Sequence, residues 1–138
     1  MTGPFVLDCS VVLAVLLPDE QSPQAQDVIG SMAASRASVP QHWALEVANG
    51  LLMAVRRRRI DDEFRRGAIE DAASLPVEVA NDTSAWAWSA LSDLAIRHSL
   101  TIYDAAYLEL ARRRRLPLAT LDRRLTAAAS AEGVKLIL

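Results

Sequence analysis

The stretch FVLDCS at residues 5–10 decides how this chain folds. Its first three residues are apolar and predict a short buried strand. Asp8 ends that strand, and the chain turns at once into the apolar stretch 11–17, which predicts a helix. Open α/β sheets bind their ligands outside the carboxyl ends of the strands, so this carboxylate occupies a position that favours chemistry.

Asp122 repeats the arrangement near the other end of the chain. Residues 118–121 form a second strand candidate, and residues 123–131 have the composition of a helix. Two strand ends therefore present acidic side chains.

Two further acids stand in similar apolar surroundings. Asp104 follows residues 100–103 and is expected to start the helix that continues over 105–114. Glu46 lies within a predicted helix over residues 42–58. Together with Asp8 and Asp122, these acids span nearly the whole chain.

Strand and helix patterns alternate along the sequence. The order predicts an α/β fold, in which a mostly parallel sheet is covered by helices on both faces in a three-layer α/β/α domain. We find no repeat or linker and expect one domain over residues 1–138. The expected strands are 4–7, 38–39, 77–79, about 118, and 134–138; the expected helices are 11–17, 23–35, 42–58, 61–73, 84–98, one starting at Asp104, and 123–131.

Composition limits the classes of protein to consider. The longest apolar run, 11–17, is far below the roughly 20 residues of a membrane helix, and no basic segment precedes it as in a signal peptide. We expect a soluble, cytoplasmic protein without a membrane partner. Cys9 is the only cysteine, which excludes an internal disulfide and a cysteine-rich zinc site.

Positive charge is concentrated although the formal net charge is only -2. Four arginines occupy residues 56–59 and four more occupy residues 112–115. Such patches suit phosphate groups, but cations at helix ends also complement the helix macrodipole and point to solvent. The pattern leaves both interpretations open.

The four acids together indicate a metal site. Hard cations such as Mg²⁺ or Mn²⁺ prefer oxygen ligands, and neighbouring carboxylates repel one another unless a cation neutralises them. One or two such ions orient and activate a water and stabilise charge on a phosphodiester, which is the chemistry of nucleic-acid hydrolysis. Ser10 has no histidine partner that would make it a nucleophile.

Each acid also has an ordinary structural explanation. Asp104 and Asp122 are in positions to cap helices, Asp8 could belong to a turn with Ser10, and Glu46 could be an exposed helix residue. Capping does not explain why acids follow strand ends in this order, and the set as a whole favours a shared site.

The same segments resemble a known family. Residues 5–10 (FVLDCS), 46–49 (EVAN), 103–108 (YDAAYL) and 119–125 (ATLDRRL) are together similar to PIN-domain ribonucleases, and most of all to the VapC toxins of type II toxin–antitoxin systems. The resemblance covers essentially the whole chain in the expected order and spacing.

That resemblance implies a PIN-like fold, an endoribonuclease activity and a set of site residues. The four acids would be catalytic and would bind Mg²⁺ or Mn²⁺, and Ser10 and Thr120 would be supporting hydroxyls near the metal. It further implies an RNA substrate such as a tRNA or ribosomal RNA, a homodimer, and a small VapB-type antitoxin whose tail occupies the groove near the acids. The acids concerned are Asp8, Glu46, Asp104 and Asp122.

Ser10, Thr120 and Asn49 are candidates for supporting the acids, and each also has an ordinary structural explanation. Hydroxyls such as those of Ser10 and Thr120 commonly bond nearby backbone instead. Asn49 lies three residues after Glu46 on the same helical face, where it either touches the metal water or satisfies backbone. His42 has no nearby partner pattern, and we assign it no catalytic role.

Two other classes of function are compatible with acids at strand ends. A receiver-like phosphoacceptor domain should have an adjacent acidic pair near the first strand and a lysine at a late strand end, but Asp8 stands alone and Lys135 is the only lysine. A non-catalytic PIN-like module that binds RNA or a partner without cleavage is a third interpretation, and the intact acids argue against it.

Overall fold

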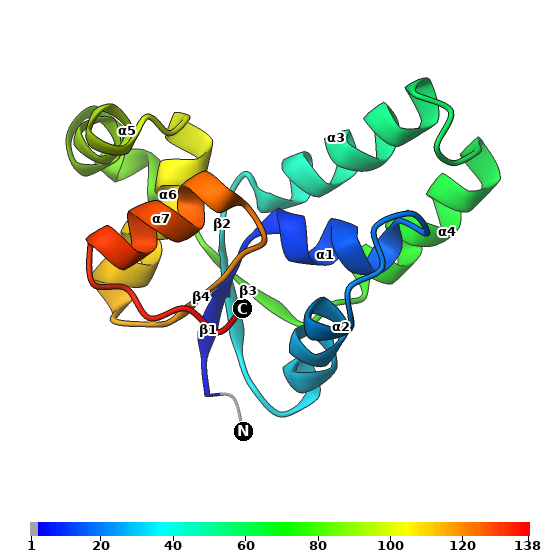
Figure 1. The fold of residues 1–138 in the computed structure, drawn as a ribbon, viewed down its shortest axis with the longest axis horizontal. Coiled ribbons are helices and arrows are strands. Elements are labelled where there is room, and N and C mark those ends of the chain that lie inside the picture. Colours follow the sequence, from blue (N-terminus) through cyan, green and yellow to red (C-terminus); the bar gives the residue numbers. More distant parts are fainter. Residues whose placement is uncertain (1–2) are drawn as a thin grey trace.

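The computed structural model describes residues 3–138 and arranges them around a parallel sheet (Figure 1). Its strand order is β3-β2-β1-β4, with β1 in the interior, so segments from opposite ends of the chain lie side by side. All three strand pairs are parallel, which confirms the predicted sheet. The strands are β1 (Phe5–Leu7), β2 (Ala37–Pro40), β3 (Val77–Ala80) and β4 (Leu118–Ala119).

Helices cover both faces of this sheet and make the three-layer α/β/α fold. In Figure 1, α1 to α4 lie on one side of the sheet and α5 to α7 on the other, and the two groups open away from each other above the carboxyl ends of the strands. The α-helices are α1 (Cys9–Leu16), α2 (Pro23–Gly30), α3 (Trp43–Arg56), α4 (Asp62–Ala73), α5 (Ser92–His98), α6 (Ile102–Arg114) and α7 (Arg123–Ala131). Shorter helical turns are η1 (Ser31–Ala33), η2 (Thr83–Trp86) and η3 (Ala87–Leu91).

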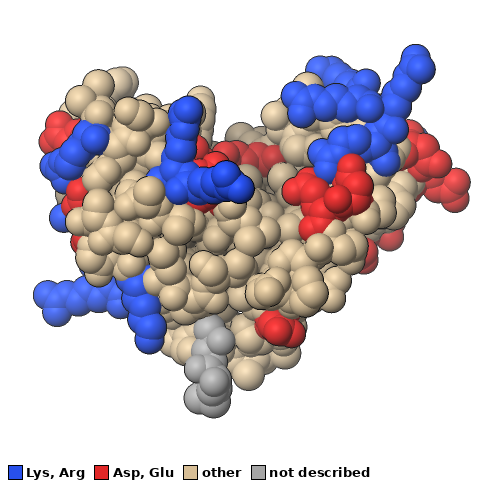
Figure 2. All heavy atoms as spheres, in the orientation of Figure 1, with Lys and Arg blue, Asp and Glu red and all other residues tan. Residues whose placement is uncertain are grey.

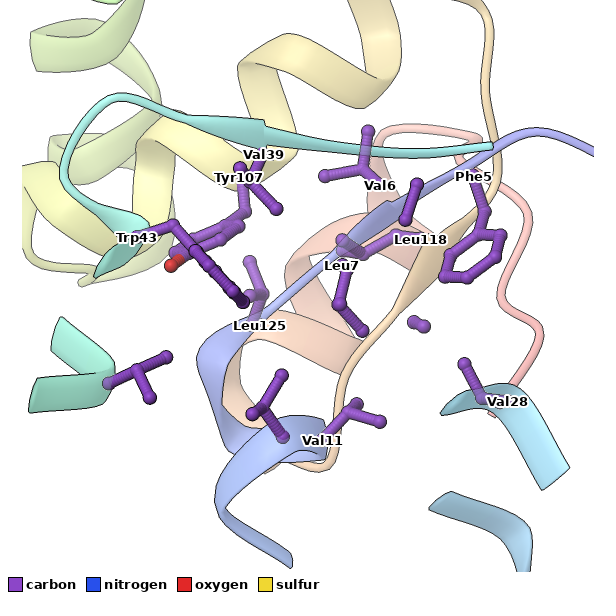
Figure 3. Close-up of a cluster of buried hydrophobic side chains, with 14 of the residues drawn as sticks. Phe5, Val6, Leu7, Val11, Val28, Val39, Trp43, Tyr107, Leu118 and Leu125 are labelled. Carbon is purple, nitrogen blue, oxygen red and sulfur yellow. The ribbon is translucent and has the colours of Figure 1, made fainter. Parts of the chain in front are cut away.

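The core lies between the sheet and both helical layers. All three residues of β1 are fully buried, and Figure 3 shows Tyr107 and Leu125 approaching the strands from the helices on one side while Val11 and Val28 lie on the other. Burying each large aliphatic side chain contributes about 2 kcal/mol. The tightly packed sheet therefore holds the residues at the carboxyl ends of its strands in defined positions.

Side-chain caps set where several helices begin. The Ser22 hydroxyl accepts from the Ala25 amide ahead of α2, and Asp61 accepts from the Phe64 amide ahead of α4. The Thr101 hydroxyl accepts from the amide of Asp104, so α6 begins at Ile102. The prediction that Asp104 starts this helix was wrong by two residues, and Asp104 lies inside the first turn.

Two predicted elements differ from the structure more strongly. The expected strand over 134–138 is reduced to one isolated bridge between Leu118 and Leu136. The segment lies at the margin of the sheet and is only partly buried. The expected helix over 84–98 is divided into the 3₁₀ turn η2, the π-helical turn η3 and the short helix α5. Likewise, the helix expected over 23–35 ends at Gly30 and continues only as the 3₁₀ turn η1.

The remaining boundaries agree with the sequence to within one to three residues, which is the usual scatter at element ends. Within residues 3–138, no helix is both long enough and apolar enough to cross a membrane.

Candidate active site

The four predicted acids come from four elements that meet at one edge of the sheet. Asp8 directly follows β1, and Asp122 precedes α7 in the turn after the neighbouring strand β4. Glu46 and Asp104 lie in the first turns of α3 and α6. The acids are close enough to interact electrostatically, since Asp8 interacts with Glu46 and Asp104, and Asp104 interacts in turn with Asp122. The fold therefore brings these four acids together at the carboxyl edge of the sheet.

Asp8 is the most deeply buried of the four, with 2 % of its surface exposed. Its Oδ2 accepts hydrogen bonds from the Ser10 hydroxyl at 2.6 Å and from the Thr120 hydroxyl at 2.7 Å. Burial raises the pKa of Asp8 to about 6; these two hydrogen bonds oppose the shift, and the charges of Asp104 and Glu46 add to it. The fold thus holds a carboxylate where it is costly to ionise without a neutralising cation.

Ser10 and Thr120 do more than contact Asp8. The Ser10 hydroxyl also accepts from the amide of Leu121 at 2.9 Å, and the Thr120 hydroxyl accepts from the amide of Asp122 at 3.0 Å. The two hydroxyls therefore tie the turn after β1 to the turn after β4. The structure places both predicted hydroxyls on the same carboxylate.

Asp122 combines a structural role with its place in the acidic cluster. Its Oδ1 accepts from the amide of Leu125 at 2.9 Å and caps α7. The capping explanation considered for this residue is therefore correct. It does not remove Asp122 from the site, because the charge of Asp122 raises the pKa of Asp104.

Asp104 is half-buried and carries a raised pKa. Burial is the main cause, the charges of Asp122 and Glu46 add to it, and a hydrogen bond with Thr101 opposes it. The capping explanation fails for Asp104, because the cap of α6 is Thr101. Like charge around a partly buried carboxylate is typical of functional sites.

Two side chains whose roles were not predicted from the sequence contact Glu46. The buried Tyr107 hydroxyl donates to Glu46 Oε1 at 2.6 Å, and His42 Nε2 lies 3.3 Å from the same oxygen. His42 Nε2 also lies 3.0 Å from the carbonyl oxygen of Tyr103, and its ring packs at an edge-to-face angle against Tyr107. Burial raises the pKa of Tyr107, so its phenol remains a proton donor.

A signal for both missed residues was present in the sequence. His42 precedes Glu46 by four residues and Tyr107 follows Asp104 by three, spacings that place each pair on one helical face. Asn49 is exposed and its side chain makes no hydrogen bond within residues 3–138, so its predicted supporting role stays a prediction.

The donor set fits a hard divalent cation in its chemistry. The acids supply only carboxylate oxygens, they repel one another, and one of them is buried with a raised pKa. Within residues 3–138, no three His, Cys, Asp or Glu side chains stand ready to share an ion. Oε1 of Glu46 accepts from Tyr107 and Oδ1 of Asp122 accepts from its capping amide, so the second oxygen of each carboxylate is the one that would serve an ion.

The molecule is hollowed above this edge of the sheet. Figure 2 shows the hollow between the two helical groups, with acidic side chains visible within it and basic side chains on both of its sides.

A parallel sheet covered by helices on both faces, with interacting acids at its carboxyl edge, is the architecture that these observations define. The chain belongs to the PIN domain family, which it matches over residues 5–131. Among named relatives it is similar to ribonuclease VapC3 of Pyrobaculum aerophilum, with 31% identity over 121 residues covering 88% of this chain and 91% of the relative. It is also similar to ribonuclease VapC9 of Mycobacterium tuberculosis, with 32% identity over 132 residues covering 93% of each protein.

Solved structures support the same fold. PAE2754 from Pyrobaculum aerophilum has a TM-score of 0.67 and 22% identity, covering 93% of this chain and 86% of that one. VapBC2 from Rickettsia felis, solved bound to a DNA fragment from its promoter, has a TM-score of 0.66 and 10% identity, covering 96% of both chains. These identities are low, so the likeness speaks for the architecture.

Proposed function

We propose that this protein is the endoribonuclease toxin of a VapBC-type toxin–antitoxin system and hydrolyses RNA phosphodiester bonds with the help of Mg²⁺ or Mn²⁺. The observation that carries the proposal is the convergence of four carboxylates at one sheet edge, one of them buried with a pKa of about 6. Membership of the PIN family and similarity to named VapC ribonucleases support the same activity.

The residues of the chain supply a cluster of acids, two of which are oriented by hydrogen bonds. Ser10 and Thr120 orient the Asp8 carboxylate, and Tyr107 orients that of Glu46. Asp8, Glu46, Asp104 and Asp122 would hold one or two ions. When bound, the metal would neutralise the carboxylates, supply an activated water and stabilise charge on the phosphate.

Asn49 would act from the edge of this cluster. It lies on the exposed side of α3 near Glu46, where an amide can hydrogen-bond a water or a ribose hydroxyl. Substitution of Asn49 by alanine tests this role and should change cleavage without changing the melting temperature.

Partners follow from the same proposal. The solved structures with this fold include VapBC2 from Rickettsia felis and a toxin–antitoxin complex from Klebsiella pneumoniae. A VapB-type antitoxin is accordingly the partner we propose, together with a second copy of the chain. Large apolar side chains stand exposed on this protein, including Leu45, Trp88 and Ile96, which are 74%, 94% and 86% exposed.

The experiment is RNA cleavage by the purified protein freed of any inhibitor. End-labelled cellular RNA is incubated with Mg²⁺ or Mn²⁺, beside a chelator control and Asp104→Asn. Discrete cuts that disappear in both controls are the expected result, and their positions identify the target RNA.

The alternative function is a PIN-like module that binds RNA or a partner without cutting it. Two results together would favour that alternative: calorimetry shows that the protein binds the metal, and the protein binds RNA but leaves it uncut in every condition. Absence of any Mn²⁺ binding would contradict the assignment of the four acids as metal ligands.

A further inference from the structure

The basic side chains of this protein fall into two groups, those in ion pairs and those without a partner. The structure pairs the first group with acids on neighbouring elements, as in the contact of Arg59 with Asp19 and Glu20. The paired cations are Arg36, Arg59, Arg65, Arg66, Arg97, Arg112, Arg113 and Arg114. These side chains already have a structural explanation.

The second group has no ion-pair partner within residues 3–138 and is exposed. It forms three clusters. The tip triad comprises Arg56, Arg57 and Arg58, where α3 ends and the chain turns toward α4. The α7 pair comprises Arg123 and Arg124, and the remote pair comprises Arg115 and Lys135. Both arginine tetrads of the sequence are thus divided, and only part of each is free to bind a ligand.

The α7 pair occupies an electrostatically unfavourable place. Arg123 and Arg124 are the first two residues of α7, where the positive end of the helix dipole disfavours cations. They directly follow Asp122, yet neither forms an ion pair with it or with another acid in residues 3–138. Helix stability does not explain two arginines here, whereas a bound anion would be attracted both by them and by the helix terminus.

The tip triad is also incompletely explained by helix chemistry. Arg56 is the last residue of α3 and benefits from the helix dipole, but Arg57 and Arg58 lie beyond the helix end. Three adjacent like charges repel one another. The next residue, Arg59, forms ion pairs with the nearby acids Asp19 and Glu20. The triad therefore presents uncompensated positive charge.

These two clusters lie on opposite sides of the hollow that contains the catalytic acids. Figure 2 shows basic side chains over the start of α7 on one side and over the connection between α3 and α4 on the other. The remote pair lies elsewhere: Arg115 and Lys135 line a cavity of about 370 Å³ beside Pro117, ahead of the amino end of β4, whereas Asp122 follows its carboxyl end.

We propose that the α7 pair and the tip triad hold phosphates of one RNA strand on the two sides of the scissile bond. This inference rests on the proposed ribonuclease function and names how that site receives its substrate. The acids at the floor repel a polyanion, and cations on both sides compensate for that repulsion where the strand enters and leaves. A single strand crosses the hollow, because its backbone can bend toward the acids.

The test measures binding and cleavage separately. Binding uses a fluorescein-labelled single-stranded oligoribonucleotide of mixed sequence, with chelator and the substitution Asp104→Asn to prevent cutting, over a series of salt concentrations. Each phosphate contact to a single strand contributes about 0.7 to the slope of log affinity against log salt, which is roughly fivefold in affinity at 0.1 M salt. Replacing the α7 pair by glutamine should thus weaken binding roughly 25-fold, and replacing the tip triad on the order of 100-fold.

The remote pair supplies a control of matched charge. Arg115→Gln with Lys135→Gln removes two exposed cations away from the acids and should leave the salt slope unchanged. Arg123→Lys with Arg124→Lys keeps the charge and should keep most of the affinity. Circular dichroism checks that every variant is folded.

The outcomes separate this inference from the proposed function. If the parent protein neither binds nor cuts RNA, the ribonuclease proposal itself fails. Suppose that the parent binds and cuts RNA, but the α7 and tip variants show the same salt dependence of RNA affinity as the parent. The proposal that both clusters hold RNA phosphates is then wrong. An equal loss in the remote-pair variant would likewise overturn it, because binding would then follow total charge alone.

Discussion

The hydroxyl of Tyr107 donates to Oε1 of Glu46 at 2.6 Å, joining residues 61 positions apart. Removing only that hydroxyl, by Tyr107→Phe, should leave the core filled and release Glu46. Loss of such an orienting partner typically lowers metal affinity or activity 10- to 100-fold. Mn²⁺ titration calorimetry and RNA cleavage measure the effect, and Tyr103→Phe, which alters an exposed tyrosine nearby, is the control. Unchanged affinity and cleavage would show that Glu46 does not depend on Tyr107.

Thr120 gives a second prediction about orientation. Thr120→Val keeps the shape of a buried side chain but removes the donor to Asp8 and the acceptor for the Asp122 amide. We expect a loss of about 1–3 kcal/mol in unfolding free energy and slower cleavage, because buried polar partners are left unsatisfied. Thr126→Val is the matched control, since its hydroxyl bonds only the carbonyl of Asp122. The prediction is wrong if both variants cleave RNA at the parent rate.

Repulsion among the acids predicts an unusual stabilising mutation. Asp104→Asn removes a charge that burial, Asp122 and Glu46 all disfavour, so the melting temperature of the metal-free protein should rise. Asp62→Asn is the contrast, because Asp62 accepts from Arg65 and Arg66 and its loss should not stabilise. Differential scanning calorimetry in chelator distinguishes them. A clear drop for Asp104→Asn would count against electrostatic convergence.

Glu132 predicts a pH dependence away from the acidic cluster. It accepts from His98 at 2.6 Å and from Arg97 at 2.7 Å, with Arg112 at 3.4 Å, and its side chain is 11% exposed. The hydrogen bonds from His98 and Arg97 hold its pKa below the ordinary value of 4.5. A lowered carboxyl pKa stabilises the folded state above 4.5, and that contribution is lost as pH falls through the folded-state pKa.

Glu132→Gln should therefore cost about 2 kcal/mol near neutral pH and progressively less in acid. Urea unfolding of both proteins at a series of pH values measures the difference. A difference that stays constant from neutral pH down through the acid range would show that the carboxylate charge is unimportant there.

Exposed apolar side chains on one segment predict an effect on assembly. Trp88 in η3 and Ile96 in α5 are 94% and 86% exposed, so this short segment carries two large apolar side chains in solvent. If this surface joins two copies, replacing both residues by serine should convert a dimer to a monomer at micromolar concentration. Sedimentation velocity gives the mass directly. A parent and a variant of equal mass would place any dimer contact elsewhere.

Much of the architecture could be predicted because local patterns were consistent. Asp8 and Asp122 were located by the short apolar runs before them, and α7 by its composition. The start of α6 was missed because Ile102 and Tyr103 favour strands in isolation, while the capping hydroxyl of Thr101 decides the conformation.

The contacts that orient the acids could not be obtained from spacing. Thr120 reaches Asp8 across 112 positions, which requires knowing that β4 lies beside β1. Residues 134–138 looked like a strand because four of the five are apolar, yet they meet the sheet at one bridge. Strand pairing is a property of the whole fold, and a sequence pattern reports only the local preference.

The pairing of β1 with β4 also governs when activity can arise during protein synthesis. A ribosome releases Asp8 early, but Thr120 and Asp122 emerge only after most of the chain, and the strand that carries them must still dock. A chain that has grown only to residue 119 lacks Asp122, one of the four acids, and the Thr120 hydroxyl that donates to Asp8. The acidic cluster is therefore complete only after nearly all of the chain has been synthesised and β4 has paired with β1.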